Sequence, residues 1–172
     1  MKQYLMILII GLVVSAGCIS QQEPEKYTYV IKKHGIEYIF SNPIENASLI
    51  PVINETEILN EILTTTKVRM TFESHEVDNI AFQLAGVDTS SKLSHFYVYG
   101  QGRFVDMGAE ELINLTEDDK ANATIIQLKG PNTGATDTSV YLDQNGWIII
   151  QGTHQKNLTL AADRFALIYL RD

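Results

Sequence analysis

The sequence predicts a single α/β domain with a mixed sheet, two hairpins and about three or four helices. Strand-like and helix-like stretches alternate along residues 27–172, which favours the α/β class, with α+β as the alternative. Two pairs of apolar runs are joined by short polar turns, as in hairpins, so the sheet cannot be purely parallel. The chain then ends in a stretch so apolar that most of a helix formed there must be covered.

The first hairpin is expected at Tyr27–Ile31 and Ile36–Phe40, on either side of a short polar turn. An amphipathic helix is expected next, over residues 54–63. Its first residues Asn54 and Glu57 fit a capping box, with Asn54 as the N-cap. The apolar face of this helix consists of Ile58, Leu59, Ile62 and Leu63.

The middle of the chain is predicted as a strand followed by a long helix. Residues 67–73 alternate apolar and polar side chains, which is typical of a half-buried strand. Residues 78–100 have apolar positions at helical spacing, although the aromatic run FYVY near their end favours a strand. The stretch GAEELINL, residues 108–115, is predicted as a short helix or helical turn. The positions that carry the helical spacing in 78–100 are Ile80, Leu84 and Val87.

The last third of the chain is predicted as a strand, a hairpin and a helix. The strand is ATIIQL, residues 123–128, and the hairpin is SVYLDQNGWIII, residues 139–150. In this hairpin Asn145-Gly146 fits the two positive φ angles of a type I′ turn. The closing helix is LTLAADRFALIYLRD, residues 158–172.

The N-terminus has the pattern of a secretory signal peptide over residues 1–17. Lys2 supplies a positive charge, Leu5–Val14 an apolar run, and Ser15–Gly17 the small residues before a cleavage site. A transmembrane helix is the alternative, but the apolar run is shorter than the about 20 residues needed to cross a bilayer.

The only cysteine of the chain, Cys18, follows this pattern directly. The sequence SAGC resembles the lipobox of prokaryotic lipoproteins, although Ser15 stands where an apolar residue is usual. The resemblance covers residues 1–18 and implies that Cys18 is lipidated and becomes the first residue after cleavage. A buried structural thiol is the alternative. Residues 18–26 are then the lipidated cysteine and a polar tether, and 27–172 a single globular domain on the extracytoplasmic face of the cell membrane.

The charge balance argues against nucleic acid as a partner. The chain has 13 Lys and Arg against 21 Asp and Glu, a formal net charge of −8, and its basic residues do not cluster. The expected contact with the membrane is therefore the lipid anchor rather than charge. With Cys18 lipidated, the domain has no thiol for a disulfide or a metal.

Half of the ten asparagines stand in N-x-S/T sequons. Outside the cytosol this motif accepts glycans, and its density fits an archaeal-type cell-surface glycoprotein, with composition bias as the alternative. The five asparagines are Asn46, Asn54, Asn114, Asn122 and Asn157.

No motif predicts catalysis, a cofactor or a metal. No G-x-S-x-G is present, and TSSK at 89–92 lacks the nucleophile and the companion motifs of β-lactamases. None of the histidines forms a metal-binding pair in the sequence, so they are interpreted as solvated or capping residues. They are His34, His75, His95 and His154.

One loop, KGPNTGATDTS at 129–139, has small residues that let a backbone approach a ligand closely. Its candidate ligand-binding residues are Asn132, Thr133, Gly134 and Thr136, and the alternative is a plain connection into the hairpin. From this region to the C-terminus the sequence loosely resembles the C-terminal parts of archaeal envelope proteins, including S-layer-associated ones. That resemblance implies a surface role and no catalytic residue.

These observations together favour a non-enzymatic, lipid-anchored surface protein that binds an envelope partner. A small-solute-binding or sensing domain is the alternative, and a hydrolase with a site assembled from scattered residues is the third. A flat apolar patch would favour the first interpretation, and a deep pocket with histidines and a carboxylate the third.

Overall fold

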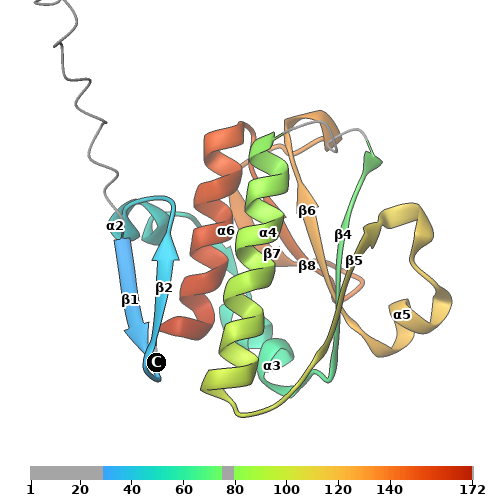
Figure 1. The fold of residues 1–172 in the computed structure, drawn as a ribbon. Helices are drawn as coiled ribbons and strands as arrows, with labels where there is room; N and C mark the ends of the chain where they lie inside the picture. Colours follow the sequence, from blue (N-terminus) through green and yellow to red (C-terminus); the bar gives the residue numbers. More distant parts are fainter. Residues whose placement is uncertain (1–28, 75–79, 172) are drawn as a thin grey trace, which may run out of the picture.

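The computed structural model describes residues 29–74 and 80–171, which form one α/β domain around a six-stranded sheet (Figure 1). Four strands are mutually parallel, β7 runs antiparallel to β8, and β3 runs parallel to β7. The predicted α/β class and mixed sheet are therefore confirmed. The order across the sheet is β3 (Val52–Ile53), β7 (Ser139–Leu142), β8 (Ile148–Gln151), β6 (Thr124–Lys129), β4 (Lys67–Phe72) and β5 (Asp106–Glu111).

Two long helices, α4 (Ile80–His95) and α6 (Gln155–Leu170), cover one face of the sheet (Figure 1). In α6 every residue from Ala161 to Leu170 is buried, because the helix lies between the sheet, α4 and the N-terminal hairpin. The predicted apolar closing helix is thus confirmed. The sheet side chains beneath the two helices are Val68, Met70, Ile126, Leu128, Val140, Ile148 and Ile150.

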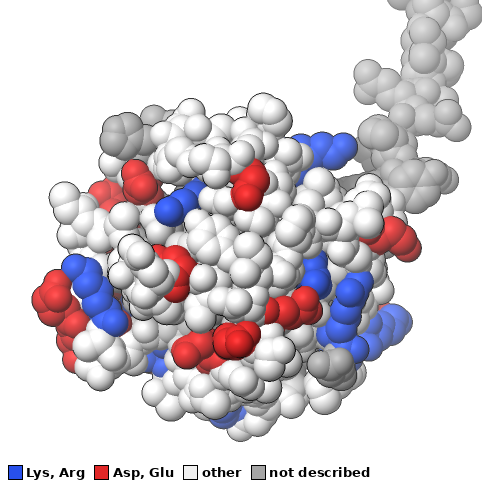
Figure 2. Space-filling view, turned by 180° about the vertical axis from the view of Figure 1, so that it is seen from behind, with Lys and Arg blue, Asp and Glu red and all other residues white. Residues whose placement is uncertain are grey.

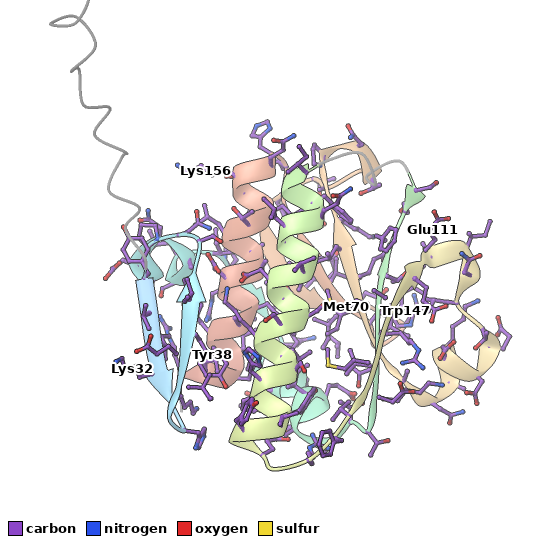
Figure 3. All side chains as sticks on the ribbon, in the orientation of Figure 1. Lys32, Tyr38, Met70, Glu111, Trp147 and Lys156 are labelled. Carbon is purple, nitrogen blue, oxygen red and sulfur yellow. The ribbon has the colours of Figure 1, made fainter. Side chains whose placement is uncertain are left out.

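The predicted N-terminal hairpin is present as β1 (Tyr29–Lys33) and β2 (Ile36–Phe40), in a sheet of its own beside α6. Its turn residues His34 and Gly35 have φ angles of 54° and 78°, the two positive values of a type I′ turn. Tyr38 lies on the inner side of the hairpin and Lys32 on its exposed side (Figure 3). A short helix α2 (Ile44–Ser48) follows.

The predicted amphipathic helix is α3 (Glu55–Thr64), but its expected cap is wrong. Asn54 occupies the N-cap position with φ 62° and ψ 45°, and its side chain makes no capping hydrogen bond. A capping side chain requires an extended backbone at the N-cap, which turns its oxygen toward the first amides of the helix. The left-handed conformation of Asn54 removes that geometry.

The helix predicted in residues 78–100 is present as α4, and it continues into a π-helical turn at Phe96–Gly100. Phe96 and Tyr97 are buried there, and the hydroxyl of Tyr97 donates to the carbonyl of Ile62 at 3.0 Å. The aromatic run FYVY therefore packs into the core as part of a helix rather than as a strand.

The helical prediction for residues 108–115 is wrong. Residues 106–111 form strand β5, paired in parallel with β4, and only Leu112–Asn114 form a 3-10 helix. The sequence DMGAEE has little intrinsic strand preference, and the pairing with β4 decides its conformation.

The predicted C-terminal hairpin is present as β7 and β8, but its turn is not type I′. Gly146 has φ 77°, whereas Asn145 is not among the residues with positive φ. The carboxylate of Asp143 instead accepts hydrogen bonds from the backbone amides of Asn145 and Trp147, at 2.8 and 2.9 Å. This Asx turn replaces the second left-handed residue.

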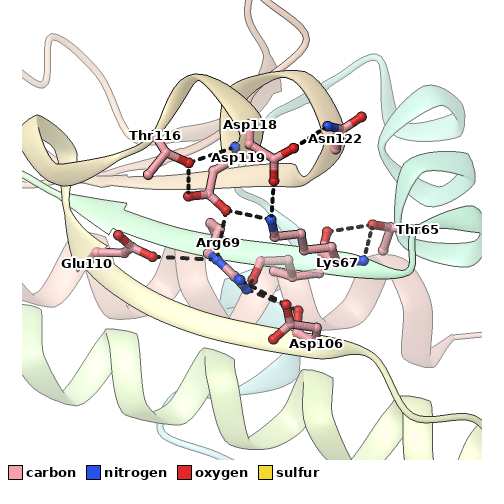
Figure 4. A network of polar contacts seen from close by, with 10 residues as sticks. Thr65, Lys67, Arg69, Asp106, Glu110, Thr116, Asp118, Asp119 and Asn122 are labelled. Atoms are coloured by element: carbon pink, nitrogen blue, oxygen red, sulfur yellow. Dashed lines mark hydrogen bonds and ion pairs between the residues drawn. The ribbon is translucent and has the colours of Figure 1, made fainter.

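Helix α5 (Glu117–Asn122) lies on the opposite face of the sheet from α4 (Figure 4). Asp119 is buried and pairs with Lys67 at 2.8 Å and Arg69 at 3.1 Å, both on β4. The hydrogen bonds from Lys67 and Thr116 hold the pKa of Asp119 well below its usual range. These contacts fix the β5-to-β6 connection across β4.

Figure 2 shows this side of the molecule, with Lys and Arg interspersed among Asp and Glu around a mainly uncharged centre. No continuous basic surface is visible on this face, in line with the charge balance of the sequence.

Candidate binding groove beside helix α4

The histidines in the described part of the chain stand apart from any catalytic arrangement. His34 is in the β1–β2 turn, His95 ends α4, and His154 is the N-cap of α6; all three are exposed. His75 lies outside the described residues. No group of three potential metal ligands is found within residues 29–74 and 80–171.

The predicted ligand loop connects β6 to β7 and is closed by its own hydrogen bonds. The hydroxyl of Thr133 accepts from the amide of Gly130 at 3.0 Å, and Gly134 takes a left-handed φ of 78°. Asn132, Gly134 and Thr136 are exposed, and Thr133 is half-buried. None of the four lines the groove described below.

The proposed modification sites divide into one outside the described residues, Cys18, and five within them. None of the sequon asparagines is buried: four are exposed and Asn157 is half-buried, where it donates to Thr153 at 3.2 Å. A glycan needs this accessibility. The exposed four are Asn46, Asn54, Asn114 and Asn122.

A buried charged cluster joins α4, α6 and the segment after β2. Lys92 pairs with Asp163 at 3.0 Å and with Asp88, while Asn42 donates its backbone and side-chain amides to Asp163 at 2.9 and 2.8 Å. Lys92 and Asp163 are both buried, and the Lys92 ammonium lies 4.5 Å from the ring centroid of Phe40. Because Lys92, Asp163 and Asn42 are buried and only Asp88 is partly exposed, we assign the cluster to structure rather than to ligand binding.

One candidate site is an apolar groove of about 470 Å³ between α4 and the outer strands of the sheet. In Figure 1, β4 and β5 lie to the side of α4, and no helix in the described residues covers that part of this face. Met70 lies on the inner side of the sheet beside α4 (Figure 3). The groove, as the term is used below, is lined mainly by Met70, Phe72, Phe82, Val87, Ala109 and Leu128.

Helix α4 has apolar residues on two faces. A helix that packs against the core with one face is normally polar on the opposite face. Phe82, Ala85 and Leu93 are buried against the core. The residues whose spacing predicted this helix point the other way: their exposed fractions are 72% for Ile80, 60% for Leu84 and 70% for Val87. They form an exposed apolar stripe that joins the groove at Val87.

A second hollow, of about 370 Å³, opens at the carboxyl ends of β4 and β5. The chain leaves β4 for α4 on one face and leaves β5 for α5 on the other, so the connections diverge at this point. Ligand sites of open α/β sheets form at such switch points. Phe72 lines both this hollow and the groove, and Glu73 and Glu111 supply carboxylates. Glu111 lies at the end of the β5 edge (Figure 3).

Strand β5 is the last strand of the sheet, and no other strand within residues 29–74 and 80–171 pairs with its outer side. The backbone amide of Asp106 donates to the carbonyl of Thr66 at 3.1 Å, so the N–H and C=O groups of Asp106 point toward β4. Because peptide groups alternate along a strand, Met107, Ala109 and Glu111 direct their N–H and C=O groups to the open edge.

No known protein family, curated protein or solved structure matches this chain. In the described ranges, none of the helices has both the length and the apolar character to cross a bilayer. The groove was missed by sequence reasoning because its residues come from β4, α4, β5 and β6. The available signal was the excess of apolar residues in 80–87, which could not all face one core.

Proposed function

We propose that this protein is a lipid-anchored, glycosylated, non-enzymatic module of the cell surface that binds an envelope protein through the groove. The observation that carries the proposal is the apolar groove continuous with the exposed stripe of Ile80, Leu84 and Val87. Contiguous exposed apolar surface of this kind marks protein interaction sites in soluble domains.

A protein partner fits the groove better than a small polar solute does. Solute sites combine an apolar pocket with several converging polar groups. In the groove, the Ser90 hydroxyl donates to the Gly86 carbonyl of its own helix at 2.8 Å, so its proton is not available to a solute. The groove also reaches the edge strand β5, because Ala109 is part of its lining.

The location rests on the sequence of the N-terminus, where Cys18 is the proposed lipid attachment and residues 18–26 the tether. The accessible sequons are compatible with glycosylation, and no sequon asparagine lines the groove.

Site-specific photocrosslinking of the full chain in the cells that produce it tests the proposal. A photoreactive residue at Val87 should give one discrete adduct with an envelope protein. The matched control is Leu49, which is 80% exposed but lies at the end of α2, away from the groove. Equal labelling at both positions, or none at Val87, would show that the groove is not the docking surface.

The anchor is tested separately. Cys18→Ser should leave an uncleaved precursor or a released protein, because no thiol is left to lipidate. Mass spectrometry of the mature N-terminus that finds an unmodified Cys18, or cleavage elsewhere, contradicts the lipoprotein assignment.

A further inference from the structure

The open backbone edge of β5 and the groove lie together, and on this basis we infer how the partner of the proposed function is held. We propose that the partner supplies an extended, basic segment, which adds to the sheet beside β5 as a seventh strand. In this mode the backbone supplies affinity, and pockets for alternate side chains supply specificity.

The backbone geometry fits strand addition. Three residues, Met107, Ala109 and Glu111, present their peptide groups to the open side of β5, as the Asp106-to-Thr66 hydrogen bond establishes. Edge strands that must stay unpaired are commonly very short, bulged, covered by another element or blunted by charged side chains. The charges of β5 are all acidic, so they would repel an acidic strand but not a basic one. The pairing of β5 with β4 is continuous from Asp106 to Glu111, without a bulge.

The two faces of the added strand would meet different surroundings. On the α4 side, every second side chain would lie over the groove, whose wall at this edge is Ala109. On the other side, the neighbouring β5 residues are Asp106 and Glu110, both in contact with Arg69. A segment that alternates apolar and basic residues matches both faces.

The charges near this edge favour a basic occupant. The ion pairs behind β4 and β5 join two cations to four carboxylates, which leaves an excess of two negative charges. Glu73 and Glu111, which line the second hollow at the carboxyl ends of β4 and β5, make no ion pair with another described residue. The cations are Lys67 and Arg69, and the carboxylates are Asp106, Glu110, Asp118 and Asp119.

The same charges disfavour a second copy of this chain as the occupant. Antiparallel pairing of β5 with itself would bring Glu110 and Glu111 of one copy toward Asp106 of the other at both ends. Like charges directly opposite one another destabilise strand pairs.

The test uses Ala109→Pro, which removes an outward N–H that the β4 ladder does not use. Proline is tolerated at edge positions whose N–H faces solvent. Ala109→Ser keeps the N–H and is the matched control. In the full chain with the photoreactive residue at Val87, the adduct should disappear for Ala109→Pro and persist for Ala109→Ser.

The charge requirement is tested with two fluorescent hexapeptides, one alternating valine with lysine and the other valine with glutamate. We expect anisotropy to show binding of the lysine peptide only. Ala109→Pro should weaken that binding about tenfold, as expected for a lost hydrogen bond plus a ring clash. Glu110→Gln should also weaken it, because Glu110 lies on the face that the lysines would meet, and this variant leaves the backbone unchanged if the proline variant fails to fold.

The outcomes separate this inference from the proposed function. An adduct that persists in Ala109→Pro, or equal binding of both peptides, overturns the strand-addition inference and leaves the groove as a docking surface. Absence of any Val87 adduct in the wild-type protein overturns both. A dimer in sedimentation equilibrium that Ala109→Pro dissociates identifies a second copy as the occupant and also overturns the inference.

Discussion

Asp163 is expected to be the residue whose loss costs this domain most stability among its carboxylates. Its side chain is 0% exposed and accepts from the Lys92 ammonium at 3.0 Å and from two Asn42 amides at 2.9 and 2.8 Å. Asp163→Ala leaves the buried Lys92 cation with Asp88 alone and the Asn42 backbone amide without its acceptor, while the Asn42 side-chain amide keeps only the Thr159 hydroxyl at 3.3 Å. Breaking a buried pair in this way costs about 3–5 kcal/mol. For a domain of this size that corresponds to a fall in Tm of about 10–15 °C.

Urea and thermal unfolding followed by circular dichroism measure this loss. The matched control is Glu117→Ala, because the Glu117 side chain is 91% exposed and its pair with Lys120 should contribute at most about 1 kcal/mol. If Asp163→Ala lowers stability no more than the control does, the buried cluster does not tie the two helices together, and the structural role assigned to it is wrong.

Three further changes have defined outcomes. Asp119, whose pKa is held low by Lys67, should stabilise the fold above the unfolded pKa of about 3.9 and lose that effect as pH falls. In Asp119→Asn the free energy of unfolding should therefore fall less between about pH 5 and pH 2 than it does in the wild-type protein. Gly152→Ala places a Cβ 2.2 Å from the Leu158 amide and should cost about 3 kcal/mol or more in chemical denaturation. Gly134→Val, at φ 78°, should cost about 1–3 kcal/mol and change no ligand response in a thermal-shift screen of sugars, nucleotides and anions, if the loop is a connector.

Three elements, β4, α6 and the N-terminal hairpin, could be predicted from the residues within them. The alternation in 67–72 specified β4, and the nearly continuous apolar stretch at the C-terminus specified α6. The hairpin at 29–40 also followed from its own residues, because His34-Gly35 can adopt two positive φ angles. In each case a short stretch contains both the driving force and the geometry.

Tertiary structure alone decided β5, and two local predictions, the cap at Asn54 and the turn at Asn145, were wrong. The segment 106–111 is a strand because β4 offers it hydrogen-bond partners, and no residue within it favours that conformation strongly. Asn54 and Asn145 have the composition for a cap and a type I′ turn, yet the left-handed backbone of Asn54 and the Asp143 carboxylate impose other conformations.

The groove also depends partly on local sequence and partly on tertiary packing. The sequence determined that α4 is a helix, through Ile80, Leu84 and Val87, but those residues proved to be its exposed stripe. Periodicity reports that apolar residues share one side of a helix, not which neighbour covers that side. Only the placement of α4 to one side of β5, with α6 filling the rest of the sheet face, leaves this surface uncovered.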